Sequence, residues 1–152
     1  MPQPVHCHPR AFHLFAGYLP SIDSSEGLLR AAAAISLHEL DGVDPEQVGR
    51  RLGEFAGRIR ARLRSNHVQA VLAHLHEVLF AEEGFAGNVD DYFNPYNSYL
   101  PAVLETRLGI PITLSLIYKV VGEQLGLRIE GVNAPGHFMA RLRIDDGIML
   151  VD

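Results

Sequence analysis

The chain has 152 residues and a formal net charge of −5, which suits one folded domain and argues against a protein that binds nucleic acid through surplus cationic side chains. Its composition, 47% hydrophobic and 20% charged, excludes an intrinsically disordered chain. The single cysteine, Cys7, excludes an intrachain disulfide, and the N-terminus shows no signal-peptide pattern, so we expect a cytoplasmic protein. The longest apolar run, residues 110–121, is shorter than the roughly 20 residues that span a bilayer, and we expect no membrane association.

Helices are predicted over most of the chain, after an extension at residues 1–22 that we expect to be partly mobile. Ser24 or the serine after it can cap a first helix that ends near residue 40. Asp44 can cap a second helix, in which apolar side chains recur at spacings of three and four. Asn66 is placed to cap a third helix, which Gly84 ends.

The second predicted helix carries four arginines at alternate positions, and this pattern has two interpretations. The residues are Arg58, Arg60, Arg62 and Arg64. They form either a solvated helix face, with positive charge near the helix C-terminus, or a patch that binds RNA or DNA. The acidic balance of the whole chain favours the solvated face, and we therefore expect no nucleic-acid partner.

The last third of the chain changes from helical to strand patterns. Residues 85–97 are rich in Gly, Asn, Asp and aromatic side chains, which indicates an ordered loop, and Ser98 can cap a short helix after it. An almost entirely apolar helix is predicted over 111–124 and should be buried. Alternating patterns then predict antiparallel strands at 128–133, 137–144 and 148–152.

The predicted fold class is therefore α+β, with N-terminal helices followed by a small antiparallel sheet. After the extension at 1–22, we expect one domain over 23–152. It should be helical over 23–126 and built of strands over 127–152.

Two residues of the predicted strands form a candidate catalytic pair. His137 is the one histidine in the strand region, and it follows a Pro-Gly bend. If the Asp-Asp-Gly turn joins the last two strands, His137 faces about residue 153, and Asp152 lies within one residue of that position. A carboxylate there can accept a hydrogen bond from one ring nitrogen and leave the other as a base. The alternative is an edge-strand histidine and an aspartate that have no relation to each other.

Three stretches of the sequence resemble one known family. They read LFAEEGFAGN, DYFNPYNSYLPAVLETRLGIPITLSLIY and GVNAPGHFMARL. From Leu28 to Asp152 the chain is similar to the N-terminal region of the SirB-type proteins, a branch of the transglutaminase-like superfamily. The resemblance implies a papain-like, transglutaminase-like fold, in which a nucleophilic cysteine opens a buried helix and a histidine and an aspartate follow on adjacent strands. His137 and Asp152 match that histidine and that aspartate.

The sequence departs from the family pattern at the nucleophile, because Pro111 stands where active members carry cysteine. Ser115 lies about 40° off the line of Pro111 and roughly 6 Å deeper along the helix, whereas Thr113 turns to the far side. Both hydroxyls have an alternative role as donors to backbone carbonyls inside the packed helix. Two functions follow. One is a noncatalytic or regulatory module whose cleft binds a peptide or protein; the other is an acyl-transfer or amide-hydrolysing enzyme that uses Ser115 with His137 and Asp152.

Residues before and within the apolar helix are candidates for the lining of that cleft. They are Asn94, Tyr96, Asn97, Arg107, Pro111 and Thr113. The alternative, favoured for Asn97, is that the loop residues satisfy backbone groups of an ordered loop. We expect no cofactor and no metal site, since Cys7 and its flanking histidines lie in the extension without pre-organisation. The resemblance to longer SirB-type chains predicts a truncated domain after Asp152, whose open sheet edge favours a homodimer.

Overall fold

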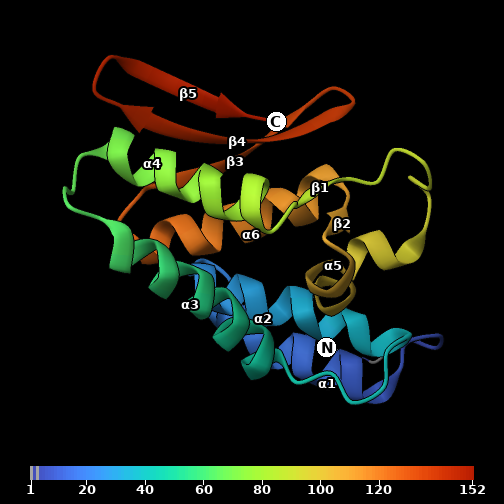
Figure 1. Ribbon diagram of the computed structural model, residues 1–152. Helices are drawn as coiled ribbons and strands as arrows, with labels where there is room; N and C mark the ends of the chain where they lie inside the picture. Colours follow the sequence, from blue (N-terminus) through green and yellow to red (C-terminus); the bar gives the residue numbers. More distant parts are fainter. Residues whose placement is uncertain (1, 3) are drawn as a thin grey trace.

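The computed structural model describes residue 2 and residues 4–152, and it places a small sheet on one side of a group of helices (Figure 1). The α-helices are α1 (Pro9–Tyr18), α2 (Ser25–Ile35), α3 (Pro45–Arg62), α4 (Val68–His76), α5 (Leu100–Thr106) and α6 (Pro111–Gln124). The 3-10 helices are η1 (Leu19–Ser21), η2 (Ser36–His38) and η4 (Pro95–Ser98). A π-helix, η3 (Glu77–Glu82), continues α4.

The strands form two separate sheets. The larger is antiparallel, in the order β3 (Ile129–Ala134), β4 (His137–Ile144) and β5 (Gly147–Val151). The smaller is a parallel pair of β1 (Ala86–Gly87) and β2 (Leu108–Gly109). In the larger sheet Ala134 lies opposite His137, Ile144 opposite Gly147, and Ala140 opposite Val151. The predicted α+β class, with helices followed by a small antiparallel sheet, is confirmed.

Helix α6 lies at the centre of the core. Its residues Ile117, Tyr118, Val120 and Val121 are each 2% exposed or less. Helices α2, α3 and α4 and the sheet formed by β3 and β4 pack around it, as Figure 1 shows for α4 and the sheet. The predicted burial of this helix is confirmed. Within the described part of the chain, no helix combines the length and the apolar character that crossing a membrane requires.

The larger sheet is covered on one face. In β4, Ala140 and Leu142 are buried, whereas Arg141 and Arg143 are exposed. Because side chains alternate along a strand, the buried residues form an inner face against α6 and the exposed residues form an outer face. In Figure 1 the helices lie on one side of this sheet, and no described element covers the other side.

The helix starts show which sequence signals were sufficient. Ser24 and Asp44 each accept a hydrogen bond of 3.0 Å from a backbone N–H in the first turn of the following helix. The predicted starts of α2 and α3 are therefore confirmed. The prediction for α4 is wrong, because the helix begins at Val68 with His67, not Asn66, at the N-cap and without a side-chain cap.

The N-terminal extension and the loop region contain structure that no pattern indicated. Of the extension at 1–22, residues 1 and 3 lie outside the described residues, and residues 9–21 form α1 and η1, which pack against α2. The strands β1 and β2 have two residues each, too few for an alternating pattern. They join the segment after η3 to the segment before α6, and so they help to position the start of α6.

Candidate functional site

His137 and Asp152 lie together, as the candidate catalytic pair requires. His137 Nδ1 is 3.4 Å from Asp152 Oδ1, and the two side chains are 56% and 57% exposed. The β4–β5 ladder ends with Ala140 opposite Val151, so Asp152 follows the last paired residue of β5 and lies near the start of β4. The carboxylate therefore reaches the imidazole diagonally across the strands. Its position can orient the ring, in a site that is open to water.

The side chains of His137 and Ser115 face opposite sides of strand β4. His137 alternates with Phe138 along β4, and Phe138 belongs to the inner face with Ala140. Ser115 of α6 lies beneath that inner face, where it contacts the same space as Phe138 and Ala140. His137 is thus on the outer side of β4, and Ser115 is on the inner side.

The first turn of α6 is fixed by a buried polar cluster. Thr113 Oγ1 donates to the carbonyl of Asn97 at 2.8 Å and accepts from the N–H of Ile110 at 3.2 Å. Asn97 is 3% exposed; its Nδ2 donates to the carbonyls of Asp91 and Tyr92 at 2.8 and 3.1 Å. Both side chains satisfy backbone groups, which matches the structural role favoured for Asn97. Together they connect the loop before α5 to the helix that carries the candidate site.

Two hollows flank Ser115. The first, which we call the aromatic hollow, has a volume of about 260 Å³ and is lined mainly by ring side chains together with Pro111, Ser115 and Asp152. The rings belong to Phe80, Phe85, Tyr118 and Phe138.

The second, which we call the aliphatic hollow, has a volume of about 420 Å³ and lies between α2, α6 and β3. Its lining includes Leu28, Ile35, Ile112, Thr113 and Leu116. Ser115, Phe138 and Ala140 line both hollows, and the side chains of Ser115 and Phe138 form the ridge between them.

Arg107 does not line these hollows, although it contacts Phe85 at the edge of the aromatic hollow. Its Nε and Nη2 donate to Glu83 Oε2 at 3.1 and 2.7 Å, and its guanidinium carbon lies 5.6 and 5.0 Å from the ring centres of Phe55 and Phe85. Arg107 also occupies the left-handed region, with φ of 63°, where the chain turns from α5 into β2. The side chain therefore fastens this turn to the end of η3 rather than lining a cleft beside His137.

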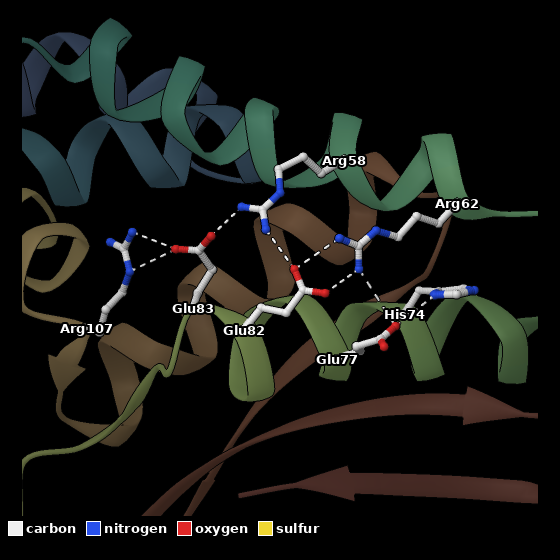
Figure 2. Close-up of polar contacts among 7 residues, drawn as sticks. All are labelled: Arg58, Arg62, His74, Glu77, Glu82, Glu83 and Arg107. Carbon is white, nitrogen blue, oxygen red and sulfur yellow. Dashed lines mark hydrogen bonds and ion pairs between the residues drawn. The ribbon is translucent and has the colours of Figure 1, made fainter.

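The arginines of α3 join the same ionic network (Figure 2). Arg58 donates to Glu82 at 2.9 Å and also to Glu83, and Arg62 donates to Glu82 and lies 3.8 Å from Glu77. The hydrogen bond from Arg58 is the main cause that holds the pKa of Glu83 below its ordinary value, against the opposing effect of burial. These cationic groups connect α3 to the π-helix.

The loop residues Asn94 and Tyr96 also lie away from His137. Asn94 Oδ1 accepts from the N–H of Tyr96 at 3.0 Å, and its Nδ2 donates to Asp91 Oδ2 at 2.9 Å, so it caps η4. The ring of Tyr96 packs edge-on against Tyr99, with ring centres 5.9 Å apart. Of the predicted cleft residues, the structure therefore gathers Pro111 and Thr113 around Ser115, and it places the others elsewhere.

A partly buried histidine, His76, pairs with the buried Tyr118, which lines the aromatic hollow; the sequence patterns did not indicate this pair. His76 Nε2 is 2.8 Å from the hydroxyl of Tyr118, and Phe80 stacks on Tyr118 with ring centres 6.1 Å apart. Burial lowers the pKa of His76 and raises the pKa of Tyr118, so both groups are neutral near pH 7. A tyrosine within an apolar helix is the signal for such a partner.

Cys7 does not line either hollow. Its Sγ lies 3.3 Å from His38 Nε2, at the end of η2. The one cysteine of the chain therefore lies next to His38, whereas the histidine of the candidate catalytic pair, His137, belongs to β4.

Comparison with known proteins identifies the family context of this geometry. A model of the transglutaminase-like superfamily matches residues 46–152, which include α6, His137 and Asp152. A UPF0162 protein of Xylella fastidiosa is 34% identical over 131 residues, which are 86% of this chain and 47% of that protein. A UPF0162 protein of Haemophilus influenzae is 29% identical over 113 residues, which are 74% and 42% of the two chains.

F-box only protein 21 of Mus musculus is 42% identical over 91 residues, which are 60% of this chain and 14% of that protein. The chain spans about half the length of the UPF0162 relatives that it matches. No solved structure matches it.

Proposed function

The chain belongs to the transglutaminase-like superfamily, and we propose that this domain is a noncatalytic module that binds a peptide or protein segment in the hollows beside Ser115. The observation that carries the proposal is that His137 alternates with the buried residues of β4 and is exposed, whereas Ser115 lies beneath the buried face of that strand. A general base has to come within about 2.6–3.2 Å of the hydroxyl that it deprotonates, directly or through one water. Pro111 at the first position of α6 supplies no side chain that could replace the missing thiol.

The lining of the two hollows supports binding of apolar side chains. The aromatic hollow presents four rings, and the aliphatic hollow presents carbon side chains from α2 and α6. Ligand sites are typically apolar with a few polar groups that fix orientation, and Ser115 and Asp152 are such groups here. An extended peptide places alternate side chains about 7 Å apart on one face. We propose that two such side chains straddle the ridge formed by Ser115 and Phe138.

The test is selection of peptides from a random library displayed on phage, followed by measurement of the dissociation constant of a selected synthetic peptide. Ile112 is half exposed at the rim of the aliphatic hollow, so Ile112→Glu places a charge there, in a helix first turn that tolerates acids. The matched control is Val89→Glu, an exposed apolar residue that lines neither hollow. We expect binding to weaken at least about tenfold in Ile112→Glu, which corresponds to about 1.4 kcal/mol. Equal binding by both variants would refute the proposal.

The alternative function is an acyl-transfer or amide-hydrolysing enzyme that uses Ser115, with His137 as base and Asp152 as orienting residue. A fluorophosphonate probe labels activated serines, and on our proposal it leaves this protein unlabelled. Labelling that is lost in both Ser115→Ala and His137→Ala would establish the enzyme instead. We propose that this domain meets its peptide or protein partner in a reducing, cytoplasmic compartment, since the single cysteine of the chain offers no intrachain disulfide.

A further inference from the structure

The outer face of the three-stranded sheet is an exposed surface that the proposed hollows do not use. Strand pairing brings four apolar side chains to this face, namely Val132, Met139, Ile148 and Leu150. Ile148 and Leu150 are 62% and 55% exposed. In Figure 1 this face forms one boundary of the molecule, and no described element covers it. An apolar row of this kind on a charged surface marks an interaction site more often than a random surface does.

Cationic side chains flank that apolar row. Arg128, Arg141 and Arg143 line one hollow of about 450 Å³ on the outer face, together with Ile148 and Glu130. Glu130 forms an ion pair of 2.5 Å with Arg141 and also interacts electrostatically with Arg128, whereas Arg143 is in none of the ion pairs found among the described residues. The patch is positive in a chain whose formal net charge is −5.

From these observations we infer that the outer face docks an amphipathic helix of a partner protein, with an apolar stripe bordered by Asp and Glu. The apolar stripe covers Met139, Ile148 and Leu150, and the acidic borders face Arg128 and Arg143. Arginine is suited to such carboxylates because its planar guanidinium donates two parallel hydrogen bonds to one carboxylate and is weakly hydrated. The inference concerns a surface separate from the hollows, so it holds or fails independently of the proposed function.

The architecture favours a helix as the occupant. Sheets in α+β domains are stabilised by helices packed on their faces, and α6 already covers the inner face in this way. The outer side of β4 from His137 to Arg143 spans about 20 Å, which equals roughly 13 residues of helix. Nucleic acid is the less favoured partner, because phosphate binding rests on many cations and has no use for the exposed Ile148 and Leu150.

The test uses two synthetic 18-residue helical peptides with the same leucine stripe, one with Glu and one with Lys on both borders. Binding to the whole 152-residue protein is measured by titration, and the contact is mapped by amide chemical shifts. We expect the Glu peptide to bind, to shift amides of β3, β4 and β5, and to weaken as salt rises. The Lys peptide should bind at least about tenfold less tightly.

Charge-reversal variants provide the matched comparison. Arg128→Glu with Arg143→Glu should weaken the Glu peptide at least about tenfold, because two attractive contacts become repulsive. Arg10→Glu, at an exposed arginine of α1 outside the sheet, should leave binding unchanged. Circular dichroism confirms that each variant is folded. The inference is overturned by equal binding of the two peptides, by shifts confined to the hollows, by an unaffected double variant, or by a DNA oligonucleotide that binds this face more tightly than the Glu peptide.

Discussion

The hydroxyl of Thr113 is expected to determine the stability of the α6 start, and the prediction can be worked from its contacts. Thr113 is 7% exposed, donates to the carbonyl of Asn97 and accepts from the N–H of Ile110. Thr113→Val keeps the shape of the side chain and removes both hydrogen bonds. Leaving the carbonyl of Asn97 and the N–H of Ile110 without these hydrogen bonds should lower the free energy of unfolding by about 1–3 kcal/mol, even though the new methyl group of valine contacts the core. Thr113→Ser keeps the hydroxyl and loses one methyl, at a cost of about 0.8 kcal/mol.

The two variants separate hydrogen bonding from packing. If the hydrogen bonds dominate, Thr113→Val is less stable than Thr113→Ser; if volume dominates, the order is reversed. The assay is urea unfolding followed by circular dichroism, in which the midpoint changes while the slope stays constant. For a domain of this size, 1–3 kcal/mol lowers Tm by roughly 2–12 °C. A valine variant as stable as the native protein would refute this account of the α6 start.

Three further predictions follow from burial, steric fit and strand geometry. Burial lowers the pKa of His76 below its ordinary value of 6.5, so the unfolded state binds the extra proton more readily. The free energy of unfolding should therefore be constant well above pH 6.5 and fall as the pH decreases through that value. In His76→Gln, the urea midpoint should depend less on pH. A Cβ at Gly27 would lie 2.0 Å from the carbonyl oxygen of Ser21, so Gly27→Ala should destabilise the protein by about 3 kcal/mol. A Cβ at Gly57 has nothing within 4 Å, so Gly57→Ala should stabilise the protein by about 0.5–1 kcal/mol. Measurements of Tm check both variants. If copies associate through the open edge of β5, Leu150→Pro should shift sedimentation toward monomer, because Leu150 stands where the N–H points away from β4; an unchanged profile would exclude that edge.

Most of the fold could be predicted because its signals are local. Ser24 and Asp44 cap their helices through hydrogen bonds within one turn, and the apolar run of α6 by itself indicates burial. The π-helix η3 and the short β1 and β2 were missed, since a pattern of two to six residues has no resolvable period. The sequence predicted a cleft residue at Arg107 and not its ion pair with Glu83 or its contact with Phe55, because these partners are distant in sequence. Its left-handed φ gives no signal either, as glycine is the usual residue there.

The candidate pair shows why a site can be predicted while its chemistry is not. The sequence places Asp152 within one residue of a position opposite His137, whereas in the structure the β4–β5 ladder ends at Ala140 opposite Val151, one residue before Asp152. The observed register brings the two side chains to 3.4 Å; the Asp152 carboxylate also lines the aromatic hollow beside Ser115, whereas the His137 ring lies on the exposed side of β4. We propose that the orientation of the His137 ring, on the side of β4 opposite the buried Ala140, favours binding over catalysis at this site.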